Sequence, residues 1–330
     1  MNALSGIREF GFKTNSCIGS ARRQKGFILN LILTADDFGR SPAINQAVLR
    51  AHRQGVLTAA SLMVSGEAFG DAVRIARDTP TLAVGLHLVL ADGRGVLPAD
   101  RIPQLVNADG CFPNAPARLG MRYFFDPRAR RQVALEMEAQ FERFAQTGLP
   151  MAHVDGHQHM HLHPAVFPLL VKLATQYGAA GVRVPRDDLR FALRYNSQRA
   201  LTKILWAAAF GCLGRRARRR LAGQNLAVAD RVYGLMQSGH MDEAYVISLL
   251  ERARDVSLPQ EKRGLTTKSQ RHEVKSTVEI YFHPTTGPRT DDLGPNPGEL
   301  QTLLSPDVRR TIEKRAARLC SYADLREGTR

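Results

Sequence analysis

The sequence has few of the features that mark a secreted, disulfide-bonded or membrane-spanning protein. Its 330 residues include only four cysteines, Cys17, Cys111, Cys212 and Cys320, and none of them forms a Cys-x-x-Cys pair. Cysteines spaced so widely indicate a reduced, cytoplasmic chain. The best candidate for an apolar span, residues 204–213, has about half of the roughly 20 residues that a membrane-spanning helix needs. We therefore expect neither disulfide bonds nor a membrane span.

A formal net charge of +15 suggests a nucleic-acid-binding protein until the position of the charge is considered. Residues 1–29 carry a net charge of +4, residues 215–220 add +5, and residues 261–275 add +3, so these segments hold 12 of the 15 charges. The rest of the chain is close to neutral and contains no recognisable nucleic-acid-binding motif. We expect no nucleic-acid partner, a poorly ordered extension at residues 1–28 and a basic inserted loop at residues 261–275, which lack apolar periodicity.

Short apolar segments alternate with segments of helical periodicity along the chain. We expect strands at residues 28–35, 57–64, 82–90, 152–156, 181–185 and 277–282, and helices at residues 42–55, 67–78, 126–148, 163–178, 201–221 and 241–254. Repeated strand–helix units predict a parallel sheet, and their number favours a (β/α) barrel over an open sheet. The prediction is an α/β fold with one barrel domain over residues 29–330.

Polar side chains lie where several of the predicted strands end. Asp36 and Asp37 follow the first strand, His87 lies in the third, and His283 precedes a proline directly after the last. Taken singly, an Asp-Asp pair is more often a helix cap, and a lone histidine in a strand is more often a hydrogen-bonded core residue. Together, however, side chains from the ends of several strands are how an α/β enzyme forms its active site.

The segment from His153 to His163 is unusually rich in histidine. It holds five of the ten histidines of the chain within eleven residues. In an extended backbone, alternation would place His153, Asp155 and His157 on one face. All five imidazoles therefore cannot bind a single ion.

One aspartate with two histidines is a ligand set that leaves coordination positions for water and a substrate oxygen. Two imidazoles and a carboxylate suit Zn²⁺, and Mg²⁺ is the alternative divalent ion. Because neighbouring side chains of a strand point in opposite directions, one of Asp36 and Asp37 could bind the ion while the other accepts a proton. The pattern predicts a metal-dependent hydrolase; a metal-dependent phosphoesterase is the second possibility, although it would need more carboxylates for two ions.

The motifs at these positions resemble those of the YdjC-like carbohydrate deacetylases, which include the chitooligosaccharide deacetylases. The matching elements are the ADDFG segment at residues 35–39, Gly85 with His87, the histidine-rich residues 153–161, the His283–Pro284 pair and the closing residues 319–325. The resemblance implies a distorted barrel of the polysaccharide-deacetylase type. It also implies removal of the N-acetyl group from an N-acetylated amino sugar.

The same resemblance assigns roles to individual residues. It implies a divalent metal ion held by Asp37, His87 and His157, with Asp36 as the general base and His283 as the acid. It places His159 and His161 either in the substrate groove or behind the metal ligands, and gives Arg183 either a substrate contact or a structural ion pair.

Residues 122–127, 157–164 and 230–241 resemble the hopanoid-biosynthesis-associated members of the family more specifically. That resemblance implies an N-acetylglucosaminyl hopanoid, a sugar carried on a lipid, as the substrate. Residues 204–220, an apolar segment followed by arginines, would then contact the anionic inner membrane peripherally. A core-packed helix with a solvated basic end is the alternative, and homo-oligomerisation stays open.

Overall fold

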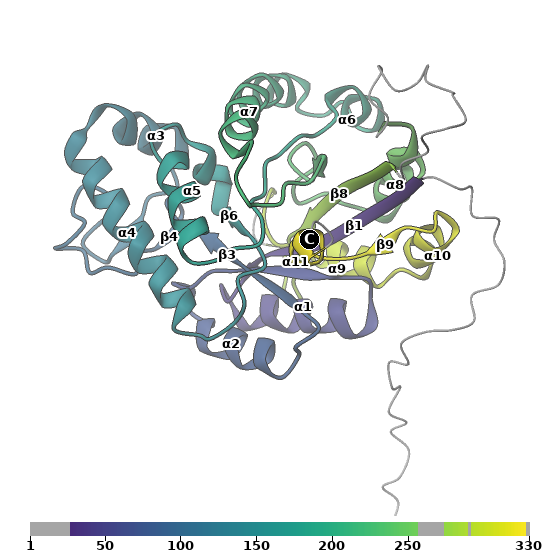
Figure 1. Ribbon diagram of the computed structural model, residues 1–330, viewed down its shortest axis with the longest axis horizontal. Coiled ribbons are helices and arrows are strands. Elements are labelled where there is room, and N and C mark those ends of the chain that lie inside the picture. Colours follow the sequence, from purple (N-terminus) through teal and green to yellow (C-terminus); the bar gives the residue numbers. More distant parts are fainter. Residues whose placement is uncertain (1–26, 257–273, 290–291, 328–330) are drawn as a thin grey trace, which may run out of the picture.

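The computed structural model describes residues 27–256, 274–289 and 292–327 (Figure 1). Most of the expected extension, residues 1–26, and most of the expected basic loop, residues 261–273, lie outside the described residues. The strands that follow these two segments begin slightly earlier than the sequence suggests.

A parallel sheet curled into a half-barrel forms the centre of the fold. Its strands run in the order β6-β3-β2-β1-β8-β7, with β9 also pairing with β1, and all the pairings are parallel. The bounds are β1 Phe27–Phe38, β2 Ala59–Leu62, β3 Ala83–Leu88, β6 Val154–Gly156, β7 Arg231–Tyr233, β8 Val274–Phe282 and β9 Arg318–Leu319. The predicted α/β class with a distorted barrel is confirmed.

Strand β1 organises the sheet. It pairs with β8 over nine residues, from Phe27 opposite Val274 to Ala35 opposite Phe282. On its other side β1 pairs first with β9 and then with β2, where the register shifts between Ala35 and Phe38. Such irregularities are frequent beside active sites because they redirect side chains. Here the irregularity falls on the two adjacent aspartates.

Helices cover the sheet and frame its carboxyl edge (Figure 1). Their bounds are α1 Pro42–Gln54, α2 Phe69–Arg77, α3 Pro116–Phe125, α4 Pro127–Ala145, α5 Phe167–Gln176, α6 Leu189–Tyr195, α7 Ala200–Leu221, α8 Glu243–Val256, α9 Pro297–Leu304, α10 Pro306–Lys314 and α11 Tyr322–Glu327. The expected cap of the first helix is present, because the backbone N–H of Ile44 donates to Ser41 Oγ at 3.3 Å. Strands β4, Gly93–Arg94, and β5, Cys111–Phe112, form a small separate sheet.

The structure differs from the sequence-based assignment around residues 157–185. A 3-10 helix, η1 His157–Leu162, follows β6, and α5 begins only at Phe167 rather than at residue 163. The expected strand at residues 181–185 makes only isolated bridges, Val154 to Val182 and Gly181 to Ala227. The three residues of β7 are too few to show a periodic pattern, which is why the sequence did not predict this strand.

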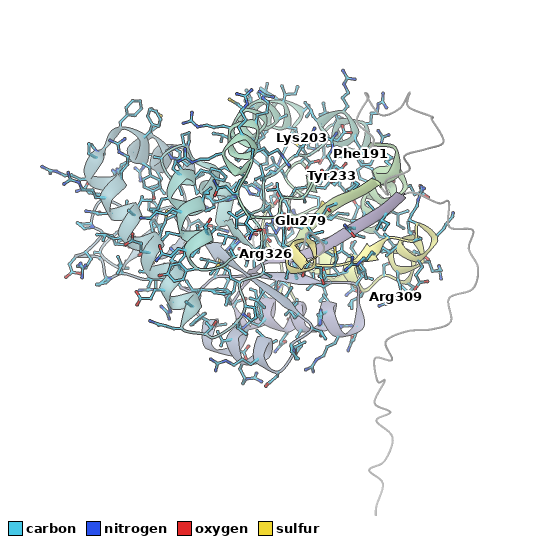
Figure 2. The ribbon with its side chains drawn as sticks, viewed as in Figure 1. Phe191, Lys203, Tyr233, Glu279, Arg309 and Arg326 are labelled. Carbon is cyan, nitrogen blue, oxygen red and sulfur yellow. The ribbon has the colours of Figure 1, made fainter. Side chains whose placement is uncertain are left out.

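Charged side chains reach the interior of this sheet as well as its surface (Figure 2). Glu279, on strand β8, is completely buried near the middle of the molecule, whereas Arg309 on α10 lies at its periphery. Within the described ranges, no helix combines the length and the apolar character that crossing a membrane requires.

Candidate functional site

The three predicted metal ligands meet at the carboxyl edge of the sheet. Asp37 ends β1, His87 lies on β3, and His157 begins η1. Asp37 Oδ1 is 3.1 Å from His157 Nδ1 and 3.5 Å from His87 Nε2, and one potential ligand atom from each residue lies within 4.8 Å of the other two. All three side chains are buried. The structure therefore brings these residues together in a group that could hold a metal ion.

The carboxylate of Asp37 is left partly unsatisfied in this group. Its Oδ2 accepts a hydrogen bond from Arg40 at 3.1 Å, but Oδ1 is buried and makes no well-formed hydrogen bond. Buried polar atoms without a partner are uncommon, and an absent ion is one recognised explanation. The backbone of Asp37 has φ of 64°, in the left-handed region that few residues other than glycine adopt.

The electrostatics of the group favour positive charge. Burial alone would raise the pKa of Asp37, but the His157 and His87 imidazoles and Arg40 hold this pKa well below its usual range. Burial alone would lower the pKa of His87, but Asp155, Asp37 and Asp36 raise this pKa to about 10. The carboxylates that surround the two imidazoles therefore stabilise positive charge at this position.

Asp155, on β6, orients His87. Its Oδ1 lies 2.7 Å from His87 Nδ1, so the other ring nitrogen, Nε2, faces Asp37. A carboxylate behind a histidine is the usual arrangement for fixing the tautomer of a metal ligand. On the far side of the group, Asp92 Oδ2 lies 3.4 Å from His157 Nε2.

Asp36 lies beside the metal-ligand group and is held by contacts of its own. Its Oδ2 accepts a hydrogen bond from Arg183 at 2.7 Å, and Ser61 Oγ lies 3.3 Å from Oδ1. His283, directly after β8, places Nε2 4.0 Å from Asp36 Oδ2. The backbone N–H of His283 donates to Glu299, which fixes the chain at this point. Asp36 and His283 therefore face each other beside the three potential ligands.

Arg183 lies beneath the site, with no exposed surface. One guanidinium nitrogen, Nη1, contacts both Asp36 and Asp155 at 2.7 Å, while Nε donates to Glu279 at 3.0 Å. Burial opposes its charge, but these three carboxylates raise the pKa of Arg183 well above its usual value. Of the two roles open for Arg183, the structure displays the ion pair.

The histidine-rich segment does not stay extended. The strand ends at Gly156, and Gln158 and His159 have φ of 50° and 54°, so the predicted simple alternation beyond Gly156 is wrong. The cause is local, because the chain turns at once into the 3-10 helix η1. Side chains beyond the strand therefore follow the turn and do not alternate between two faces.

The turn separates the histidines into different environments. His159 Nε2 lies 2.9 Å from the Tyr281 hydroxyl, and this histidine lines the pocket. His161 is completely buried, with Nε2 3.0 Å from the carbonyl oxygen of Arg183. Burial lowers the pKa of His161 to about 4. His153 packs against Gly85, where a Cβ atom would lie 2.4 Å from the imidazole ring.

A cavity of about 970 Å³ opens above these residues. Asp36, Asp37, His87, His157 and His283 form its polar floor. Its walls are largely apolar and come from two helices, with Met121, Phe124 and Phe125 on α3 and Trp206, Phe210 and Leu213 on α7. An apolar pocket with a few converging polar groups is the usual form of a small-molecule site.

Several residues of the site were not assigned from the sequence. Ser61, Asp92 and Glu299 had no motif that distinguished them from ordinary strand, loop and helix residues. Glu279 had a signal, because a carboxylate inside the apolar VEIYF segment must be paired when that strand is buried. Its partners are Arg183, Thr34 and Tyr322.

Comparisons with known proteins identify a family and several relatives of this chain. A family model described as YdjC-like protein matches residues 30–314. The carbohydrate deacetylase of Geobacillus stearothermophilus is 43% identical over 162 residues, which cover 49% of this chain and 60% of that protein. The carbohydrate deacetylase of Mus musculus is 30% identical over 323 residues, covering 90% of this chain and 95% of that protein.

A solved structure has the same fold. It is a putative cellobiose-phosphate cleavage protein from Enterococcus faecalis, with a TM-score of 0.63, 23% sequence identity, and coverage of 91% of this chain and 99% of that one. The region matched by the family model runs from β1 to the end of α10 and includes the whole centre described above. This chain belongs to the YdjC-like family.

Proposed function

We propose that this protein is a metal-dependent hydrolase that removes the N-acetyl group from an N-acetylated amino sugar. The observation that carries the proposal is the group formed by Asp37, His87 and His157, with its unsatisfied carboxylate oxygen at the floor of the pocket. Two imidazoles and one carboxylate fit Zn²⁺, and Mg²⁺ is the alternative. The carbohydrate deacetylases similar to this chain support the same reaction class.

The remaining polar residues are placed for proton transfer. A divalent ion held by Asp37, His87 and His157 would polarise a carbonyl oxygen and acidify water. Asp36 is held by Arg183 and is therefore oriented as a proton acceptor, the role of a general base. His283, on the other side of Asp36, is the group that would protonate the departing amine. His159 lines the pocket and would contact the sugar, while His161 and Arg183 support the floor from below.

A two-metal phosphoesterase is the weaker candidate. A second possible ligand group consists of Asp36, His87 and Asp155, and it shares His87 with the first. Arg183 contacts both of these carboxylates at 2.7 Å. Its guanidinium already supplies the positive charge that a second ion would bring, so the geometry favours a single ion.

Within this reaction class, we propose an N-acetylglucosaminyl hopanoid as the substrate, with a chitooligosaccharide as the alternative. The apolar side chains of α3 and α7 offer a surface for the ring system of a lipid beside the polar floor. A chitooligosaccharide would bring mainly hydroxyl groups to these walls and would leave much of this surface unused.

Mass spectrometry tests the substrate directly. We expect the metal-loaded protein to remove acetyl from N-acetylglucosaminyl hopanoid faster than from N,N′-diacetylchitobiose, because only the hopanoid buries the apolar walls. If only N,N′-diacetylchitobiose reacts, the proposed substrate is a chitooligosaccharide and not the hopanoid. Loss of acetyl from neither compound would contradict the proposed reaction.

Helix α7 is also the proposed point of peripheral membrane contact. Leu201, Ile204 and Leu205 are strongly exposed on it, and exposed arginines follow toward its end. An exposed apolar segment followed by a basic one on the same helix fits the surface of an anionic bilayer. Arg218 is different, because its guanidinium donates to the carbonyl oxygens of Val184 and Ala229 within the protein.

Vesicle binding distinguishes membrane contact from an ordinary exposed helix. Replacing both Ile204 and Leu205 by glutamine should weaken co-sedimentation with phosphatidylglycerol vesicles by about tenfold, since less apolar area enters the bilayer. Leu135→Gln on α4 is the control, because this leucine is also exposed but lies outside the pocket. Equal binding of the double variant and the control would argue against contact through α7.

A further inference from the structure

Asp92 brings a further carboxylate into the pocket, beside His157. It follows β3 and directly precedes β4, so it reaches the site from a loop and not from a strand of the large sheet. The backbone of Asp92 has φ of 48°, in the left-handed region. A residue other than glycine keeps such a conformation where the surrounding structure imposes it, and conformations of this kind gather at functional sites.

The segment that carries this carboxylate is held at both ends by α4. Gln140 donates to the carbonyl oxygen of Val89 at 2.7 Å and accepts from the N–H of the same residue at 2.9 Å. Glu136 accepts from the N–H groups of Val96 and Leu97 at 2.7 and 2.9 Å. Both side chains of α4 are completely buried, and Gln140 also donates to Glu136 at 2.8 Å. A buried polar network of this kind makes the segment rigid.

The middle of the segment is fixed as well. The N–H of Asp92 donates to the carbonyl oxygen of Pro113 at 3.3 Å. One residue group away, the completely buried Tyr123 of α3 donates its hydroxyl hydrogen to the carbonyl oxygen of Leu90 at 2.8 Å. Contacts with two helices and with the residues after β5 therefore set the position of the Asp92 carboxylate.

The two predicted metal-binding histidines have matching surroundings. Each imidazole turns one nitrogen toward Asp37, Nδ1 in His157 and Nε2 in His87. The remaining nitrogen of His87 lies 2.7 Å from Asp155. The remaining nitrogen of His157 lies 3.4 Å from Asp92. A carboxylate behind a metal-binding histidine fixes the tautomer and the orientation of the ring.

Asp92 is placed behind a potential ligand and not among the ligands. Among the described residues, two groups have ligand atoms within 4.8 Å of one another, and Asp92 belongs to neither. It is linked to Asp37 through Arg40, which donates to Asp37 Oδ2 at 3.1 Å and lies 3.6 Å from Asp92 Oδ2. Asp92 thus supports His157 directly and Asp37 through one side chain.

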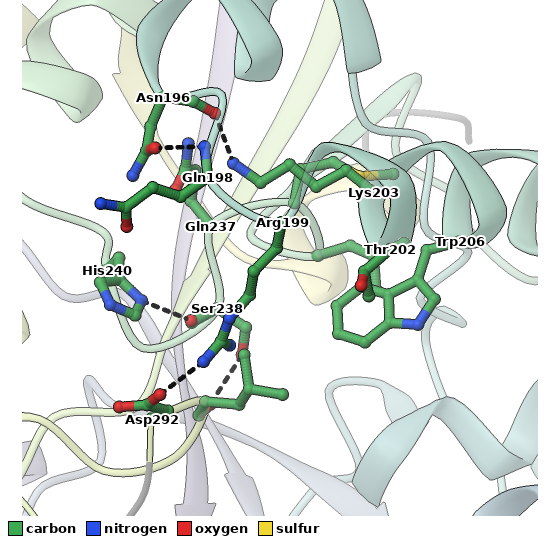
Figure 3. Close-up of a pocket in the computed structure, with 13 residues that line it drawn as sticks. Asn196, Gln198, Arg199, Thr202, Lys203, Trp206, Gln237, Ser238, His240 and Asp292 are labelled. Atoms are coloured by element: carbon green, nitrogen blue, oxygen red, sulfur yellow. Dashed lines mark hydrogen bonds and ion pairs between the residues drawn. The ribbon is translucent and has the colours of Figure 1, made fainter.

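An ion pair beside a cavity is not by itself a sign of function. A smaller cavity of about 410 Å³, between the start of α7 and the loop after β7, contains the pair of Arg199 and Asp292 (Figure 3). These two side chains are 47% and 67% exposed, and pairs as exposed as this contribute little. The side chains of His157 and Asp92 are only 10% and 27% exposed. Their contact is therefore better shielded from solvent.

We propose that Asp92 is a positioning residue that holds the His157 ring with Nδ1 directed at the metal ion. The inference rests on the proposed metal-dependent function and adds a second carboxylate that prepares the metal site. Since Asp92 is partly exposed and Asp155 is completely buried, Asp92 should contribute less to metal binding than Asp155 does.

Replacement by glycine separates the carboxylate from the backbone conformation. Glycine adopts positive φ without strain, so Asp92→Gly removes the side chain and still permits the same loop. We expect this variant to raise the Kd for Zn²⁺, measured against a competing chelator, by about tenfold, the lower end of the range for a residue that orients a ligand. Asp92→Asn keeps an acceptor oxygen and tolerates positive φ, so its Kd should lie between those of the wild type and Asp92→Gly.

The same two replacements at Asp109 are the matched controls. Asp109 is an exposed carboxylate shortly before β5, and it does not line the pocket. Both control variants should bind zinc like the wild type. Thermal unfolding of all the metal-free proteins shows whether each variant is folded.

Cobalt absorption reports on the orientation of the ring. The visible spectrum of bound Co²⁺ depends on the arrangement of its ligands, so it responds to a rotated imidazole. In protein saturated with Co²⁺, Asp92→Gly should change the shape of this spectrum, whereas the Asp109 controls should match the wild type. A residue that only stabilised the fold would leave the spectrum unchanged.

The possible results are distinct. Zinc affinity of Asp92→Gly equal to that of the Asp109 controls, or a cobalt spectrum equal to that of the wild type, would overturn the proposal. A loss of zinc affinity as large as that of His157→Ala would make Asp92 a ligand and would overturn its positioning role. Acetate release is measured separately, and its absence in the wild type would contradict the deacetylase function without changing what metal binding shows for Asp92.

Discussion

Asp36→Asn is expected to lower kcat for acetate release by about 10²- to 10⁴-fold, the contribution typical of a positioned general base. Asparagine keeps the size of the side chain but has no carboxylate to take the proton. Asp36 lies outside the group formed by Asp37, His87 and His157, so bound metal should stay at the wild-type level. Acetate release and the metal content of the purified protein measure the two quantities independently.

The control for this variant must account for Arg183, which loses a charged partner when Asp36 is replaced. Glu279→Gln removes another carboxylate from the same guanidinium, yet Glu279 is not among the residues that line the pocket. Both variants should be less stable to heat, because a buried charge loses compensation. Only Asp36→Asn should also lose its rate of hydrolysis. Equal kcat losses in the two variants would show that Asp36 acts through the fold rather than as a base.

The strands that carry the site could be predicted from the sequence because their patterns are strong. The segment from Ile28 to Ala35 and the segment from Thr277 to Phe282 are almost continuously apolar or β-branched, as strands buried on both faces are. Since strand ends of a parallel sheet meet at one edge, Asp36, Asp37 and His283 could be placed near one another. The structure has them there.

What could not be predicted depends on contacts between distant segments. The 3-10 turn at His157 interrupts a pattern that reads as extended, and nothing in its neighbours signals the positive φ of Gln158 and His159. Arg183 and Glu279 are 96 residues apart, and their pairing appears only when the curled sheet brings the segment of Arg183 close to β8. Three-residue strands such as β7 are too short for periodicity to reveal.

The second large effect concerns the metal ligands themselves. Loss of a residue that only orients a metal ligand typically weakens metal binding by roughly 10- to 100-fold. His157→Ala and Asp37→Ala are each expected to weaken Zn²⁺ binding by more than this. Both variants should also stop releasing acetate. Both residues would contribute a ligand atom directly to the three-residue group. Zinc titration with a competing chelator gives the dissociation constants.

A graded series makes this prediction specific. Asp155→Asn leaves all three ligand atoms in place but weakens the support of His87, so its loss of zinc affinity should fall within that 10- to 100-fold range. His52→Gln is the matched control, because His52 bonds to Leu57 and Thr81 far from the pocket and should bind zinc like the wild type. Wild-type affinity in both His157→Ala and Asp37→Ala would contradict the assigned ligand set. A loss in Asp155→Asn as large as in the ligand variants would instead move Asp155 into the coordination sphere, as the alternative group of Asp36, His87 and Asp155 requires.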